Sequence, residues 1–141
     1  FVHPLRDIWY KETTSYGTFR TFSSGRTEWH NATDMATGGG NPVYSTNSGN
    51  VLFAGWLGLT GNTIILDHGC GIMSWHYHLS SIEVSEGGFV EKDQLIGRVG
   101  TTGLSTGNHL HFGITVGGIF TDPMAMIGTE PNFDFEKVKT E

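Results

Sequence analysis

Histidine is the residue type through which this sequence could do chemistry. Two of its seven histidines, His109 and His111, are separated by one residue in the run 109–116, which is typical of a β-strand. Side chains two positions apart on a strand share a face and lie roughly 6.5 to 7 Å apart, so one imidazole could bind a metal ion while the other contacts a metal-bound water. Histidine pairs are also common on exposed strand faces, so this pair alone does not define a site.

A histidine and a carboxylate lie four residues apart at His30 and Asp34. Imidazole nitrogen and carboxylate oxygen are donors that suit Zn²⁺. Catalytic zinc usually has three protein ligands and one position open for water, and His30, Asp34 and one histidine of the 109/111 pair would supply them. The alternative is a surface loop in which Asp34 caps a turn.

A second alternating pair is formed by His76 and His78. On a strand over residues 72–79 these two side chains would share a face, which could be the face that carries His109 and His111. Histidines that do not bind the metal can orient its water, take a proton from it, or stabilise a tetrahedral oxyanion. The alternative is two half-buried histidines that hydrogen-bond to their neighbours in a sheet.

Short apolar runs broken by glycine are expected to position these groups. Glycine accounts for 21 of the 141 residues, and the runs recur at intervals near ten residues, which is typical of an all-β sandwich or barrel-like sheet. One short helix is expected over residues 123–127, with Asp122 as its N-cap. Residues 1–15 are expected to form an arm or a short helix packed on the body. Strands are expected over residues 42–45, 51–56, 63–66, 72–79, 95–99 and 109–116.

The composition excludes several classes of protein. The net charge of −6 and the lack of a Lys/Arg cluster argue against a nucleic-acid-binding protein. No apolar run approaches the roughly 20 residues of a membrane span. The single cysteine, Cys70, excludes an internal disulfide framework. Since the sequence starts at Phe1 without a leader, we expect a fragment or processed product whose signal peptide or anchor lies outside it.

The order of the motifs resembles that of lysostaphin-type zinc metalloendopeptidases, the peptidoglycan-cleaving enzymes of the LytM/lysostaphin class. The stretch 95–112 (LIGRVGTTGLSTGNHLHF) closely resembles the C-terminal signature of this family. Residues 30–34, with 41–44 and 49–51, resemble its first metal motif and the strands after it. Residues 64–69 and 78–80 resemble its middle block. The resemblance runs from about residue 17 to residue 127, nearly the whole chain.

This resemblance assigns roles to five residues. His30, Asp34 and His111 match the three ligands of one Zn²⁺ per chain, and His109 and His78 match the two catalytic histidines that are not ligands. The implied reaction is attack of a zinc-bound water on a peptide carbonyl. The implied fold is a compact antiparallel β-sheet or sandwich, similar to the duplicated hybrid motif, with very little helix.

Further positions are interpreted as substrate contacts or as departures from the family pattern. His76 stands where the family usually has tyrosine, and Asn108 stands where proline is common; both are expected near the substrate. Trp29 could line the groove or belong to the core. Ala32 replaces a usual glycine, which would strain the loop if that backbone needs a positive φ.

The resemblance also implies the substrate and the location. We expect an N-terminal arm (1–16), a zinc metallopeptidase domain (17–128) and a C-terminal extension (129–141). The substrate would be bacterial peptidoglycan, at cross-links or stem peptides, and the location extracytoplasmic, either periplasmic or associated with the cell envelope. The alternative is a non-catalytic wall-binding or amidase-regulating module of the same fold. The sequence does not distinguish a D-alanyl cross-link from a glycine bridge, and it leaves the oligomeric state open.

Overall fold

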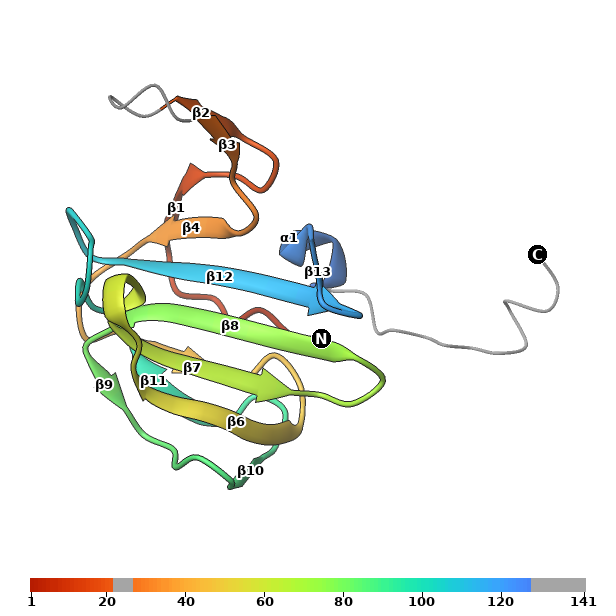
Figure 1. The fold of residues 1–141 in the computed structure, drawn as a ribbon. Helices are drawn as coiled ribbons and strands as arrows, with labels where there is room; N and C mark the ends of the chain where they lie inside the picture. The colour runs from red at the N-terminus through yellow and green to blue at the C-terminus, as the bar shows by residue number, and fades with distance from the viewer. Residues whose placement is uncertain (22–26, 128–141) are drawn as a thin grey trace, which may run out of the picture.

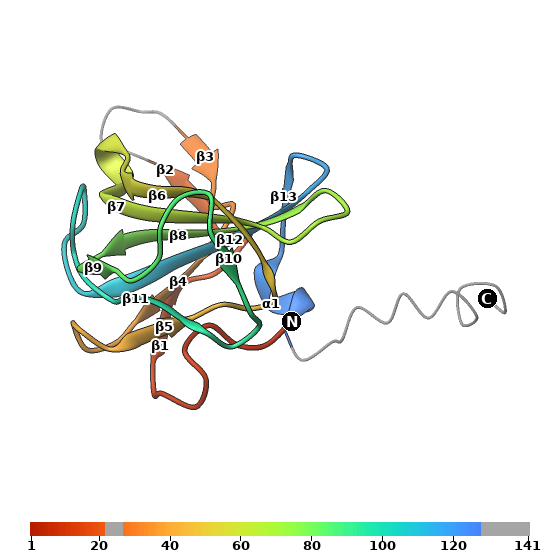
Figure 2. The same ribbon diagram turned by 90° about the horizontal axis from the view of Figure 1, so that it is seen from below.

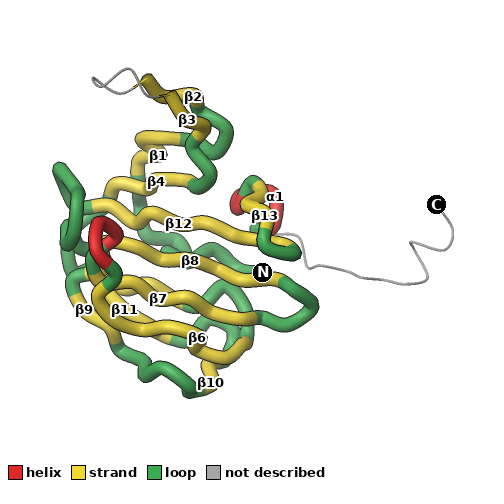
Figure 3. Tube along the Cα trace, viewed as in Figure 1, coloured by secondary structure: helices red, strands yellow, loops and turns green. Residues whose placement is uncertain are grey.

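The computed structural model describes residues 1–21 and 27–127, with only the backbone described for residues 19–21 and 27–29. The expected C-terminal extension, residues 129–141, lies outside the described residues. Strands are the main regular structure of the described chain, and helix is confined there to two short segments, η1 (Gly58–Thr60) and α1 (Pro123–Met126) (Figure 3). The expectation of an all-β fold with very little helix is confirmed. None of the helices in the described ranges is long and apolar enough to cross a membrane.

An antiparallel sheet of eight strands dominates the fold (Figure 1). Its long strands lie at the centre, and β13 (Ile119–Thr121) pairs with one of them, β12, outside the main order. The main order is β1 (Lys11–Thr14), β4 (Thr33–Ala36), β12 (His109–Val116), β8 (Ile72–Leu79), β7 (Asn62–Asp67), β6 (Gly49–Trp56) and β10 (Phe89–Val90).

A smaller sheet forms the second layer. It has three strands, in the order β5 (Pro42–Tyr44), β11 (Leu95–Arg98) and β9 (Ser81–Ile82). Figure 2, seen from below, shows β5 and β11 on one side of the large sheet, and the separate hairpin of β2 (Phe19–Thr21) and β3 (Thr27–Trp29) on the other. The core fills the space between the two sheets, since Val43 of β5 and Ile96 of β11 belong to one buried cluster with Ile64, Leu66 and Leu110 of the large sheet.

The alternation of side chains assigns the two faces of the large sheet. On β12, Leu110, Phe112 and Ile114 are fully buried in the core. Because side chains alternate along a strand, His109 and His111 lie on the opposite face. The same rule places Met35 of β4 in the core, and the residues on either side of Met35 on the face that carries the two histidines.

Most of the expected elements are found. Each of the six expected strands overlaps an observed one, and α1 begins after Asp122, whose side chain accepts a hydrogen bond of 3.0 Å from the Met124 amide. Residues 1–10 form no helix; the segment packs as an arm, with Phe1 and Leu5 buried in the core, and continues into β1, which pairs with β4. The strand β4 itself was not expected.

Candidate metal centre and catalytic cleft

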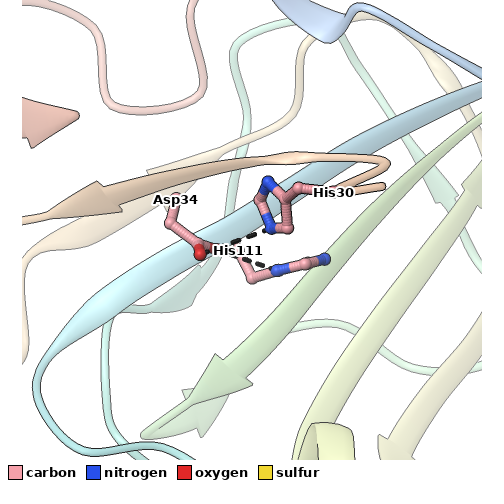
Figure 4. A group of neighbouring side chains, drawn as sticks. All are labelled: His30, Asp34 and His111. Atoms are coloured by element: carbon pink, nitrogen blue, oxygen red, sulfur yellow. Dashed lines mark hydrogen bonds and ion pairs between the residues drawn. The ribbon is translucent and has the colours of Figure 1, made fainter. Parts of the chain in front are cut away.

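Three candidate metal ligands converge on the face of the large sheet that points away from the core. The register of β12 and β4 places His111 directly opposite Asp34, and the His111 Nδ1–H donates a hydrogen bond of 2.8 Å to Asp34 Oδ1. His30 precedes β4, and its Nε2 lies 3.4 Å from Asp34 Oδ2. One ligand atom from each of the three residues lies within 4.8 Å of the others (Figure 4).

This set of donors fits a zinc ion. Two imidazole nitrogens and one carboxylate oxygen are ligands that Zn²⁺ takes. Bonds of about 2.1 Å in tetrahedral geometry place ligand atoms about 3.4 Å apart, which is close to the spacing found between His30 and Asp34. His30 and Asp34 are buried and His111 is half-buried, so one side of the cluster remains open to the cleft.

The electrostatics of Asp34 favour the charged form that a metal requires. Burial alone would raise the pKa of this carboxyl group, but the hydrogen bond from His111 and the charges of His111, His30 and His109 outweigh burial and hold its pKa at about 2. Asp34 is therefore a carboxylate at neutral pH.

His109 is turned toward the cluster by its own loop. Its Nε2 lies 3.7 Å from Asp34 Oδ1, while Nδ1 lies 2.9 Å from the Gly107 carbonyl oxygen and 3.2 Å from Ser105 Oγ. A carbonyl oxygen only accepts hydrogen bonds, so Nδ1 carries the proton. In the neutral ring, Nε2 is then a free acceptor that faces the cluster.

His78 reaches the same cleft through an irregularity in its strand. The register of β8 against β7 shifts by one residue between the pairs Asn62–Leu79 and Ile64–His76, and His78 has a left-handed backbone with φ of 61°. This is a β-bulge, which redirects a side chain out of the normal alternation. The His78 ring consequently lies beside that of His109, with 4.9 Å between ring centroids.

The protonation of His78 is set by burial and by one backbone contact. Burial lowers its pKa, the hydrogen bond to the Thr102 carbonyl raises it, and the neighbouring His109 and His111 lower it further; the net shift is downward. Nδ1 donates to that carbonyl oxygen over 2.7 Å, so Nε2 is the acceptor of a ring that is neutral at pH 7.

His76 does not lie on the same face as His78, so the prediction that these two side chains share a face is wrong. The side chain is fully buried in the core, where Nδ1 lies 3.2 Å from the Ile64 carbonyl oxygen and the ring contacts Phe112. Burial lowers its pKa to about 4. The bulge at His78 separates the two side chains, so His76 does not line the cleft and is not in a position to contact substrate.

Tyr77 takes the place on the cleft that had been expected for His76. It lies opposite His111 in the register of β8 and β12. The two rings stack in parallel, with 4.6 Å between centroids and 10° between planes. On β12, Leu110 is the residue between the two histidines, and its side chain is buried in the core. On β8 the residue between the two histidines is Tyr77, and it faces the cleft. The signal that could have found Tyr77 is which face of the strand its neighbours bury.

These side chains open into one cleft with a volume of about 650 Å³. Asn108 borders it, and its amide group lies against Gly39; its contact with substrate stays a prediction. The side chain of Trp29 lies outside the described part of the structure. Ala32 is buried without a positive φ, so it does not strain the loop. The lining residues are Thr13, Thr14, Asp34, Ala36, Leu59, Thr60, Tyr77, His78, Leu104, Ser105, Thr106, Gly107, Asn108, His109 and His111.

The sequence matches a known family over most of its length. Residues 28–123 match peptidase family M23, and the chain belongs to that family. The resemblance to lysostaphin-type peptidases is confirmed by this match and by the relatives with which the chain aligns.

Among curated proteins, the chain is 40% identical over 93 residues to the peptidoglycan DD-endopeptidase ShyB of Vibrio cholerae. It is 37% identical over 105 residues to lysostaphin of Staphylococcus simulans. These alignments cover 66% and 73% of the chain but 22% and 21% of the relatives. The chain therefore spans about a fifth of the length of the curated proteins that it matches.

Solved structures share the fold. A zinc-containing peptidase from Vibrio cholerae superposes with a TM-score of 0.78 at 35% identity, over 86% of this chain and 38% of that one. The catalytic domain of lysostaphin from Staphylococcus simulans superposes with a TM-score of 0.75 at 33% identity, over 85% of this chain and 93% of that domain. The chain is thus similar to nearly the whole of the lysostaphin catalytic domain.

Proposed function

We propose that this chain is the catalytic part of a zinc-dependent endopeptidase that hydrolyses peptide bonds in bacterial peptidoglycan. The observation that carries the proposal is the convergence of His30, Asp34 and His111 beside two further histidines, His78 and His109, in one open cleft. The peptidoglycan endopeptidases among the relatives support the choice of substrate. A peptidoglycan substrate implies an extracytoplasmic location, in the periplasm or at the cell envelope.

In this proposal His30, Asp34 and His111 hold one Zn²⁺ ion. When bound, zinc would polarise the peptide carbonyl and lower the pKa of its water toward neutrality. If His111 bound the ion through Nδ1, the proton that this nitrogen donates to Asp34 would have to leave first. The low pKa of Asp34 means that no proton has to leave the carboxyl group before the ion binds at neutral pH.

The two histidines that are not ligands would handle the protons. Both present a bare Nε2 in their neutral form, because Nδ1 of each donates to a backbone carbonyl, of Gly107 for His109 and of Thr102 for His78. Nε2 of one ring accepts the proton of the attacking water. The imidazolium that results can donate a hydrogen bond to the developing oxyanion or a proton to the leaving amine. Asn108, at the rim, is proposed to contact the peptide.

Zinc content and cleavage, measured together, test this proposal. The expected result is one zinc per chain by mass spectrometry, and release of muropeptides from purified peptidoglycan. His3→Ala is a matched control because His3 hydrogen-bonds to Tyr10 in the arm and does not line the cleft. Stoichiometric zinc without cleavage between pH 5 and 8 would contradict the proposal that the chain is an endopeptidase. A folded protein that binds no zinc and stimulates an amidase would support the non-catalytic module instead.

A further inference from the structure

Two leucines form one side of the catalytic cleft. Leu59 and Leu104 line the same cleft as His78 and His109, yet each side chain is 71% exposed. A single exposed leucine on a protein surface needs no explanation. Two of them beside reacting groups form an apolar surface that water covers when the cleft is empty, and that a ligand can cover with a gain in free energy.

The backbone fixes these two leucines relative to one another. The Leu104 amide donates a hydrogen bond of 2.8 Å to the Leu59 carbonyl oxygen. Gly61 and Gly103 have φ of 66° and 74°, and a Cβ atom on Gly103 would collide with the backbone of Gly61. The turn after η1 and the loop before β12 are therefore pressed together at positions where only glycine fits. The apolar surface is built before any substrate arrives.

The same loop holds a catalytic histidine, which ties the apolar surface to the reacting atoms. The Thr102 carbonyl oxygen accepts the His78 hydrogen bond, and Thr102 Oγ1 donates to the Leu79 carbonyl oxygen over 2.7 Å. Leu104 comes two residues later. Both leucines line one cleft with His78 and His109, and an extended peptide advances only about 3.3 to 3.6 Å per residue. The substrate residues that flank the bond under attack are therefore the ones to test against the leucines.

The rest of the lining offers little that would distinguish one side chain from another. Thr13, Thr14 and Ala36 border the cleft with small groups. Among the described residues that line it, Asp34 is the only carboxylate and there is no Lys or Arg. Among the described residues that line the cleft, Leu59 and Leu104 are the two aliphatic side chains larger than alanine, and a methyl group on the substrate would bury against them.

We infer that Leu59 and Leu104 form a specificity subsite for an aliphatic side chain next to the scissile bond. This inference rests on the proposed peptidase function. The subsite would favour a peptide that carries a methyl group at this position, as alanine does, over a glycine–glycine bond. Because each buried methyl contributes roughly as much as one CH₂ group, the preference is expected to be about threefold to tenfold in kcat/KM.

Synthetic peptidoglycan peptides that differ by one methyl group provide the test. In each pair, a residue that flanks the scissile bond is either D-alanine or glycine, and kcat and KM are measured for both. Wild type is expected to favour the methyl-bearing peptide. The double variant Leu59→Ser, Leu104→Ser is expected to lose the preference through a higher KM for that peptide, with zinc content and melting temperature unchanged. Leu52→Ser is the control, because Leu52 is half exposed on β6 and does not line the cleft.

The outcomes separate this inference from the proposed function. No preference in wild type, or a preference that survives in the double variant, overturns the subsite even if cleavage is strong. If wild type cleaves neither peptide, calorimetric titration of the same peptides into His109→Ala makes the comparison without turnover. Tighter binding of the methyl-bearing peptide, lost when the two leucines are also replaced, would still support the subsite, and equal binding would overturn it.

Discussion

Two H-x-H pairs lie on the neighbouring antiparallel strands β8 and β12, and they use their strands differently. On β12, His109 and His111 both face the cleft, and the residue between them, Leu110, is buried in the core. On β8 the middle residue, Tyr77, faces the cleft and His76 is in the core, whereas His78 returns to the cleft through the bulge. The first pair keeps the period of a strand and the second breaks it.

The difference shows how one residue of irregular backbone changes the chemistry of a face. A left-handed backbone costs about 1–2 kcal/mol for a residue other than glycine, and at His78 the hydrogen bond to Thr102 helps to hold it. Without the bulge, alternation would place His78 beside His76 in the core. The site would then have one histidine next to the ligands in place of two.

Replacing His109 or His111, the regular pair on β12, is expected to have the largest effects. The two replacements are expected to differ in whether zinc is lost together with activity. His111→Ala removes a ligand, so zinc and activity are expected to disappear together. His109→Ala is expected to keep zinc and lose activity by about 10²- to 10⁴-fold, as for loss of a general acid–base group. Metal analysis and muropeptide release measure both. If both variants retain stoichiometric zinc, the assignment of ligands is wrong.

Replacing His78 is expected to have a somewhat smaller effect on activity. His78→Ala leaves the three ligands in place, so zinc should remain while kcat falls by about 10²-fold or more. His76→Leu is the matched comparison on the same strand, and it should keep most of the activity because its side chain does not reach the cleft. Equal losses in the two variants would mean that the strand as a whole, and not its bulge, supports catalysis.

His76 is expected to govern stability and its dependence on pH. Since its pKa falls from 6.5 in the unfolded chain to about 4 in the folded one, the unfolded state binds more protons between these values. Its stabilising contribution is complete above pH 6.5 and is lost as the pH falls toward 4, by about 3 kcal/mol.

Urea unfolding at pH 7, 5.5 and 4.5, with a chelator present so that zinc release does not contribute, measures this dependence. The slope of stability against pH should be smaller for His76→Leu than for wild type. Since His3, His68 and His78 also have lowered pKa values, only the difference between the two proteins reports on His76. Identical slopes would show that His76 does not titrate as its burial requires.

Tyr77 gives the smallest expected effect. Its ring stacks on His111, and an aromatic pair of this kind contributes about 0.5–1.5 kcal/mol. Tyr77→Ala is therefore expected to weaken zinc binding by about twofold to tenfold, measured by competition with a chromogenic chelator. Tyr77→Phe keeps the ring and should bind zinc as wild type does. A loss in both variants would point to the hydroxyl group and not to stacking.

Simple periodicity accounts for the part of the site that could be predicted from the residues alone. The run 109–116 alternates regularly, so both its strand and the shared face of His109 and His111 could be derived from the spacing. The convergence of His30 with Asp34 could not, because it depends on β4, a four-residue strand without a clear pattern. The resemblance to a family supplied that assignment. The placement of His76 and His78 on opposite faces could not be predicted, since no residue type in the sequence indicates a left-handed backbone at a histidine.

The N-terminal arm bears on how this domain could be moved into another protein. Phe1 and Leu5 fill part of the core, and β1 pairs with the outer edge of β4, the strand that carries Asp34. A graft that kept only residues 28–123, the part that matches the family, would empty two core positions and leave that edge open to other chains. The transferable module is therefore longer than the region that matches the family model, and includes residues 1–14.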